Sequence, residues 1–189
     1  AEIKEKYPKM IGSIDCTEFC IQQPSSLIRQ SQCYSNYKST TTLKSLIMTD
    51  PNGYIIFVSP LFAGSISDKQ IVIDSGFLNA LKKKVTEKEI ENGDIILADK
   101  GFNVSSLLEE INIELNIPTY RVTGMQFSAQ DTEYIRKIAH ERVHVERAIG
   151  RLKSFRILKN KIPISLVGCI EQIYVVCCIL TNLRLPLRK

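Results

Sequence analysis

The sequence predicts an α/β fold in which a mixed five-stranded sheet is flanked by helices. Two observations carry this prediction: three segments of β-type pattern come first in the chain, and helical and strand-like patterns then alternate. Elements in this order bury their apolar faces by packing helices on a mixed sheet. The chain has 189 residues, of which 44% are hydrophobic, so we expect one globular domain over residues 1–189.

The first three strands are predicted from alternation and from turn residues. Residues Met10–Ile21 alternate between apolar and polar side chains and are rich in β-forming types, and Pro24 closes the segment. Two further strands are predicted at Leu43–Thr49 and Tyr54–Ser59. The segment Asp50-Pro51-Asn52-Gly53 between them is typical of a tight hairpin turn.

The middle of the chain alternates helix and strand. Ser67 is suited to cap a helix that begins at Asp68 and ends near Lys84. The short apolar run Ile95–Ala98 predicts a buried central strand, with Asp99 at its carboxyl end.

Three further elements complete the predicted domain. A helix capped by Asn103 or Ser105 extends to about Glu114, and Leu115–Val122 is suited to a last strand. The segment Glu133–Lys153 then carries apolar residues at three- and four-residue steps, which indicates a long amphipathic helix. This order of elements is that of a ribonuclease-H-like sheet, in which the fourth strand lies parallel beside the first.

Several features argue against a membrane or secreted protein. The apolar segment Ile164–Leu183 contains Glu171 and Asn182, which favours a buried core helix over a membrane span, so we expect no membrane partner. The six cysteines include no C-x-x-C pair and are interpreted as buried thiols of a reducing compartment. The N-terminus has no apolar signal region.

The long helix contains a short pattern that is found in zinc proteases. His140, Glu141 and His144 match H-E-x-x-H, in which two histidines one turn apart bind zinc and the glutamate is the general base. Such a site needs a third protein ligand, but the chain has only two histidines, and Glu171 is the only nearby acidic candidate. We therefore disfavour a zinc metalloprotease.

A helix turns by about 100° per residue, so the two histidines and the nearby Glu146 are expected on different faces of this helix. Glu146 falls beside Ile149 in the apolar stripe, so we expect it to face the core, where a carboxylate needs a cation or a metal. Arg142, one turn earlier, is the simplest partner. The histidines fall on the opposite face, which is basic and which we expect to be solvated.

Positive charge is concentrated on this part of the chain. Residues 136–161 contain nine Lys or Arg and two Glu, a local charge of +7, whereas the whole chain carries +5. A local basic excess is typical of a surface that binds a polyanion, although a solvated helix face explains the charge equally well. The residues expected to contact a DNA backbone are Arg136, Lys137, Arg147 and Arg151. Tyr34, Tyr37 and Lys38 are further candidates, but the simpler interpretation is an ordinary loop surface.

Three carboxylates on separate elements form the second candidate site. Asp15 lies in the middle of the first strand, Asp99 ends the fourth, and Glu146 lies on the long helix. Ligands gather near the carboxyl ends of central strands, and hard divalent cations prefer oxygen ligands. Two such ions about 3.5 to 4 Å apart can promote phosphodiester cleavage. The alternatives are a strand-edge residue for Asp15, a turn residue for Asp99, and a core ion pair with Arg142 for Glu146.

The segments IDCTEFCIQQP, GSISD, ILADKGF and RVHVERAIGRLKSFRIL, in this order, resemble the catalytic domain of DDE-type transposases of the PIF/Harbinger superfamily, in particular an animal branch. The resemblance implies that Asp15, Asp99 and Glu146 are the catalytic, metal-binding triad, loaded with two Mg²⁺ or Mn²⁺ ions. Asp68 matches a further, accessory acidic position. The implied activity is metal-dependent DNA cleavage and strand transfer in the nucleus, on double-stranded DNA at transposon ends or targets, by a protein that can form homo-oligomers.

The chain departs from its relatives in two places and in its extent. Many relatives have Gly-Thr-His where this chain has Cys16-Thr17-Glu18, and a tyrosine where it has Phe102. Neither change removes a triad carboxylate. Full-length relatives carry an upstream DNA-binding domain, which we expect to be absent from this chain because it starts directly at the first strand. The alternative function is a domesticated, non-cutting DNA-binding or scaffold protein with the same fold.

Overall fold

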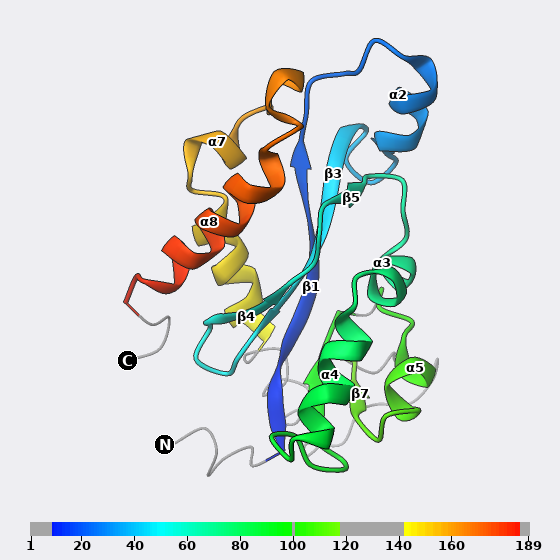
Figure 1. Cartoon of the computed structure of the whole chain (residues 1–189), viewed down its shortest axis with the longest axis vertical. Helices are drawn as coiled ribbons and strands as arrows, with labels where there is room; N and C mark the ends of the chain where they lie inside the picture. Colours follow the sequence, from blue (N-terminus) through cyan, green and yellow to red (C-terminus); the bar gives the residue numbers. More distant parts are fainter. Residues whose placement is uncertain (1–8, 100, 118–141, 186–189) are drawn as a thin grey trace, which may run out of the picture.

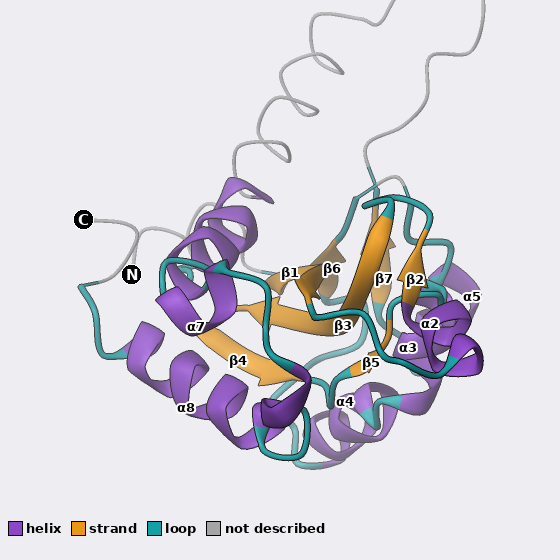
Figure 2. Cartoon of the chain, turned by 90° about the horizontal axis from the view of Figure 1, so that it is seen from above, coloured by secondary structure: helices purple, strands orange, loops and turns teal. Residues whose placement is uncertain are grey.

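The computed structural model describes residues 9–99, 101–117 and 142–185. The sheet runs through the middle of the molecule, with helices on both faces (Figure 1 and Figure 2). The strands are β1 (Met10–Cys20), β2 (Tyr34–Ser35), β3 (Thr40–Thr49), β4 (Ile55–Val58), β5 (Phe62–Ala63), β6 (Ile95–Leu97) and β7 (Glu114–Asn116). The helices are α2 (Leu27–Cys33), α3 (Asp68–Asp74), α4 (Phe77–Thr86), α5 (Ser105–Glu109), α7 (Arg156–Lys159), the 3-10 helix η1 (Ile164–Leu166) and α8 (Ile170–Asn182), and residues 142–152 form a further helix.

β1 is the central strand of the sheet. It pairs antiparallel with β3 and parallel with β6, and β6 pairs parallel with β7. The strand order is β2-β3-β1-β6-β7, and both β4 and β5 also pair with β3. This arrangement confirms the mixed, ribonuclease-H-like sheet, with the fourth predicted strand parallel beside the first. The sequence patterns did not predict β2 and β5, which are too short to show a period.

The sheet separates two hydrophobic cores. Successive side chains of a strand point to opposite faces, so β1 and β3 contribute to both cores. On one face, Ile14 and Leu46 pack with Phe77 of α4 and with side chains of α3 and α5. On the other face, Phe19 and Ile47 pack with the helix of residues 142–152 and with α8. Figure 1 shows the two groups of helices on either side of β1.

The predicted turn and helix cap are both confirmed. The Asp50 carboxylate accepts hydrogen bonds from the backbone N–H groups of Asn52 at 3.0 Å and Tyr54 at 2.8 Å, which closes the turn between β3 and β4. The Ser67 hydroxyl accepts a hydrogen bond from the backbone N–H of Gln70 at 3.2 Å at the start of α3. Both contacts are local, which is why residue types alone were sufficient to predict them.

The helix predicted from Asp68 to near Lys84 is in fact two helices. Ser75 ends α3, and Gly76 has a left-handed backbone with φ of 76° before α4 begins. Glycine adopts this conformation without the steric cost that a Cβ atom imposes. The apolar period continues across the break because both α3 and α4 pack on the same core. The sequence pattern therefore concealed the turn.

The next predicted helix and strand are shorter or shifted. The helix was expected to run from a cap at Asn103 or Ser105 to about Glu114, but α5 ends at Glu109 and its N-cap residue is Val104. β7 begins at Glu114, where the helix was expected to end. The part of the predicted strand after residue 117 lies outside the described residues.

α8 is buried on one side only, which corrects the prediction of a buried core helix. Tyr174 and Cys178 face the sheet, whereas Val176 and Ile179 are more than half exposed. Asn182 fixes the end of α8 to β4, because its side chain accepts from the Ile55 N–H and donates to the Ile55 carbonyl. In the described part of the chain, no helix is long and apolar enough to cross a membrane.

The six cysteines all lie within the described residues, and none forms a disulfide. Cys177 and Cys178 are buried, as expected for thiols in apolar segments. Cys16, Cys20 and Cys33 are only partly buried, and Cys169 is exposed, so the prediction of burial was wrong for Cys169 and holds only in part for the other three. Cys169 is the N-cap residue of α8.

Candidate active site

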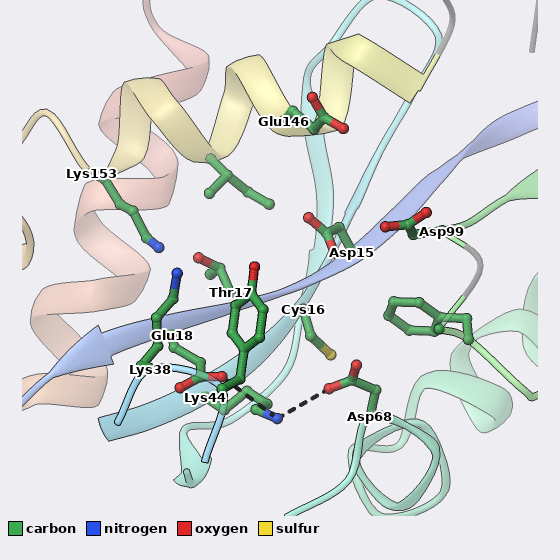
Figure 3. A pocket seen from close by; sticks show the side chains of 14 residues that line it. Asp15, Cys16, Thr17, Glu18, Lys38, Lys44, Asp68, Asp99, Glu146 and Lys153 are labelled. Atoms are coloured by element: carbon green, nitrogen blue, oxygen red, sulfur yellow. Dashed lines mark hydrogen bonds and ion pairs between the residues drawn. The ribbon is translucent and has the colours of Figure 1, made fainter. Parts of the chain in front are cut away.

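A cavity of about 540 Å³ opens between β1, the helix of residues 142–152, the start of α3 and the segment that follows β6 (Figure 3). Its volume is within the usual range of ligand pockets, roughly 300 to 1,000 Å³. Five carboxylates and three lysines line it: Asp15, Glu18, Asp68, Asp99, Glu146, Lys38, Lys44 and Lys153. All three residues of the predicted triad therefore lie around one cavity, as does the accessory acid Asp68.

The parallel pairing of β1 and β6 brings Asp15 and Asp99 to the same end of the sheet. Ser13 of β1 is paired with Leu97 of β6. The same register, continued by two residues, places Asp15 beside Asp99. The Asp99 carbonyl accepts a hydrogen bond from the Phe102 N–H at 3.0 Å, so the chain turns sharply where the strand ends. Two acids distant in sequence thus approach each other because their strands are neighbours.

Glu146 is exposed, which corrects the expectation that it faces the core. Its side chain is 57% exposed, whereas Val145, Ala148 and Leu152 on the same helix are buried. The apolar stripe is therefore centred on these residues, and Glu146 lies at its border, above the cavity (Figure 3). Local periodicity identified the helix but did not fix its rotation against the sheet.

His144 is buried, which corrects the expectation of a solvated histidine face. Only 3% of its surface is exposed. The wrong expectations for His144 and Glu146 have one cause. The helix is rotated against the sheet relative to the expected orientation, and this rotation moves His144 inward and Glu146 outward. His140 and Glu141, the other two residues of the H-E-x-x-H pattern, lie outside the described residues.

Arg142 connects two of the three triad acids. Its guanidinium lies 3.2 Å from an oxygen of Asp99 and 3.5 Å from an oxygen of Glu146, and its side chain is 15% exposed. The expected pair between Arg142 and Glu146 is therefore present, but it is shared with Asp99 and is not in the core. The chain itself places a cation between two carboxylates that a metal ion would share.

Asp15 is the most buried acid of the triad. Burial raises the pKa of its carboxyl from 3.8 to about 6, and the negative charges of Asp99 and Asp68 act in the same direction. A hydrogen bond from the backbone of Cys16 and the charge of Arg142 lower the pKa, but by less. The site thus disfavours three negative charges unless a cation compensates them.

The triad fits a divalent cation in its chemistry and its place. Carboxylate oxygens are the ligands that Mg²⁺ and Mn²⁺ prefer, and Asp15, Asp99 and Glu146 reach one cavity from β1, from the segment after β6 and from the helix of residues 142–152. Within the described residues, no three acidic, histidine or cysteine side chains are grouped closely enough to hold a metal as they stand. Arg142 lies between two of the acids, so the observed arrangement is one in which an arginine supplies the compensating charge.

Lys44 neutralises the two cavity acids that are not part of the predicted triad, Glu18 and Asp68. Its amino group lies 3.2 Å from Asp68 and 3.8 Å from Glu18, and it donates to the Ile66 carbonyl at 3.1 Å. The Thr42 hydroxyl also donates to Glu18. Asp68 thus lines the cavity while its charge is balanced by Lys44. Sequence reasoning missed this network because Glu18 and Lys44 meet only through the register of β1 and β3.

The predicted DNA-contacting residues differ in their surroundings. Arg147 is exposed, whereas Arg151 is half-buried and donates to the Leu185 carbonyl. Arg136 and Lys137 lie outside the described residues. Lys153, which the sequence analysis did not single out, lines the cavity together with Lys38. It follows Glu146 by seven residues, two helical turns, and this spacing was the signal that it shares the face of Glu146.

A comparison with protein families finds a match over most of the chain. The model of the family described as DDE superfamily endonuclease matches residues 14–182, a range that includes Asp15, Asp99 and Glu146 and most of the described chain. No curated protein and no solved structure matches the chain. Because the family model covers far more than half of the sequence, the chain belongs to the DDE superfamily endonucleases.

Proposed function

We propose that this transposase-like nuclease domain cuts DNA with divalent metal ions held by Asp15, Asp99 and Glu146, and that it also performs strand transfer. The observation that carries the proposal is that these acids, from three separate elements, line one cavity beside a compensating cation. The resemblance to the PIF/Harbinger superfamily supports action on double-stranded DNA in the nucleus, with self-association as a further expectation.

Each acid has a distinct position in the proposed site. Asp15 is held on the central strand and is the most enclosed, while Asp99 and Glu146 are more than half exposed and can reach a ligand in the cavity. When bound, two Mg²⁺ or Mn²⁺ ions would stabilise the charge on the phosphodiester oxygens and activate water or a 3′-hydroxyl. The chain contributes the fixed positions of the three carboxylates and keeps Asp68 neutralised by Lys44.

The basic residues of the helix of residues 142–152 are proposed to hold the DNA backbone. Arg147 is exposed and free of ion pairs within the described part of the chain, which supports such a contact. Arg151 has to leave the Leu185 carbonyl to contribute. Arg136 and Lys137 belong to the same proposal on sequence grounds alone.

The triad is tested by nicking of supercoiled DNA with Mg²⁺ or Mn²⁺. Asp15→Asn, Asp99→Asn and Glu146→Gln keep the size of each side chain and remove its charge. We expect each variant to lower the nicking rate by orders of magnitude, because positioned metal ions supply several kcal/mol of transition-state stabilisation. Asp74→Asn, an exposed acid of α3 away from the cavity, is the matched control and should leave the rate unchanged. Folded triad variants that nick as fast as the wild type would refute the catalytic assignment.

The second candidate is a non-cutting DNA-binding or scaffold protein with the same fold. The observation that favours it is that Arg142 already occupies the space between Asp99 and Glu146. If Arg142 holds this position permanently, the domain binds DNA but takes up no metal. Calorimetric titration with Mn²⁺ separates the two candidates. The nuclease should bind Mn²⁺ measurably and lose this binding in Asp15→Asn, whereas the non-cutting protein should not bind Mn²⁺ at all.

A further inference from the structure

Tyr37 is an exposed aromatic residue on the wall of the active-site cavity. Its surface is 82% exposed, the largest exposed fraction among the aromatic residues that the structure describes, although it helps to line the cavity. Aromatic side chains carry a large apolar surface and are enriched where proteins contact partners and ligands. An aromatic ring left open beside a polar cavity therefore indicates a contact surface for a ligand.

The backbone holds Tyr37 at the tip of a short hairpin. β2 and β3 pair with each other on either side of a turn of residues 36–39. The hydroxyl of Ser35, a residue that is 2% exposed, accepts a hydrogen bond from the Lys38 N–H at 3.2 Å, and Ser39 has a left-handed backbone with φ of 50°. An ordered turn thus presents the ring, which reduces the entropy that is lost when a ligand binds.

Lys38 occupies one face of the Tyr37 ring. Its amino group lies 4.6 Å from the centre of the ring, a distance at which the π face attracts a cation. Lys38 also lines the cavity, and Figure 3 shows its amino group directed into it. One cation covers only one of the two faces of a ring. The high exposure of Tyr37 leaves ring surface open to a flat partner.

The depth of the triad determines which flat partner comes to this place. Asp15 is the most enclosed triad acid, so a phosphodiester reaches it only by entering the cavity and leaving the outline of a duplex. The base attached to that phosphate then loses its stacking neighbours. Phe102, the other aromatic residue that lines the cavity, is only 2% exposed and cannot receive this base, whereas Tyr37 can.

We propose that Tyr37 is a stacking platform for a nucleobase that has left the duplex beside the bond that the triad cuts. The inference rests on the proposed function, because the triad is what brings DNA into the cavity. It deepens that function by naming the form of the substrate, a strand that is unpaired at the cut site. Every base has a π face, so stacking on Tyr37 favours distorted DNA without reading a sequence.

The test compares two DNA probes in the Asp15→Asn background, which prevents cleavage. One probe is a paired duplex, and the other is the same duplex with a single bulged 2-aminopurine. Tyr37→Ala should weaken binding of the bulged probe roughly fivefold to 150-fold, the effect of losing one base–aromatic stack, and should leave binding of the paired probe nearly unchanged. Tyr37→Phe keeps the ring and should bind both probes like the parent protein.

Tyr34 provides the matched control. It is a tyrosine of the same hairpin that is 44% exposed and lies outside the cavity lining, so Tyr34→Ala should leave the affinity for both probes unchanged. The fluorescence of 2-aminopurine falls when the base stacks, so it should fall on binding to the parent protein but not to Tyr37→Ala. The melting temperature of Tyr37→Ala should match that of the parent, because the ring is exposed.

Two results would overturn the stacking role alone. One is an equal loss of affinity for both probes in Tyr37→Ala, and the other is a Tyr37→Phe variant that binds the bulged probe as weakly as Tyr37→Ala. Nicking of supercoiled DNA by the wild type, measured in parallel, reports on the proposed function separately. A wild type that neither nicks DNA nor binds either probe would overturn both proposals.

Discussion

Arg142 is the residue that most affects how the site can work. It makes ion pairs with Asp99 and Glu146, the two acids of the triad that are more than half exposed. A guanidinium and a divalent cation both stabilise adjacent carboxylates, so they compete for the same oxygens. Metal uptake therefore requires the arginine to give up at least part of these contacts.

Replacing Arg142 by Met should strengthen Mn²⁺ binding several-fold, because the competing cation is removed. The loss of stability should be small, since ion pairs to largely exposed carboxylates contribute roughly 0 to 1 kcal/mol. Isothermal titration calorimetry measures the affinity and a thermal melt checks the fold. Arg147→Met, on the same helix but away from the acids, is the control. Unchanged or weaker Mn²⁺ binding in Arg142→Met alone would show that the arginine does not compete.

At the scale of single elements, the helix of residues 142–152 contributes most to the site. Val145, Ala148 and Leu152 anchor it on the sheet, and this fixes Glu146 and Lys153 on the cavity side. The same packing turns His144 into the interior. A zinc ligand of the H-E-x-x-H kind must point into an open site, so the burial of His144 argues for a packing role.

His144→Ala should therefore destabilise the protein without changing its metal content. Removing a buried ring leaves a cavity, and we expect the free energy of unfolding to fall by roughly 2 to 4 kcal/mol in urea titrations. Elemental analysis of both proteins should find no stoichiometric zinc. One tightly held zinc per wild-type chain, lost in His144→Ala, would revive the protease interpretation.

At the scale of the whole molecule, the burial of an acid in the candidate site costs stability once the pH exceeds the pKa of that acid. The sheet buries its two faces in two cores, and the acids gather where β1 and β6 leave those cores. Asp15 lies deepest there, with its pKa raised to about 6 by burial. An acid with a raised pKa binds its proton more tightly in the folded state than in the unfolded state.

The sign of this linkage gives a pH prediction for the metal-free protein. Between the unfolded pKa of 3.8 and the folded pKa of about 6, the folded state holds more protons at Asp15. The contribution of Asp15 to stability is thus full below that window and falls as the pH rises through it. Chemical denaturation across the window should show this decline in the wild type and a smaller one in Asp15→Asn. Added Mn²⁺ should restore stability above the window, and identical pH profiles for the two proteins would refute the raised pKa.

The sequence by itself determined the local features of this protein. Alternation predicted β1 and β3, turn chemistry predicted the hairpin at Asp50, and capping predicted the start of α3 at Ser67, because each depends on a few neighbouring residues. The order of strands also placed Asp15 and Asp99 at one end of a parallel pair.

Only the tertiary structure decided how the elements are turned and what they meet. It rotated the helix of residues 142–152 so that His144 points inward and Glu146 outward, and it paired Glu18 with Lys44 across two strands. It also brought Lys38 to the same cavity as Lys153. Neither a helix rotation nor a strand register is encoded in local periodicity, because both are set by the surfaces against which the elements pack.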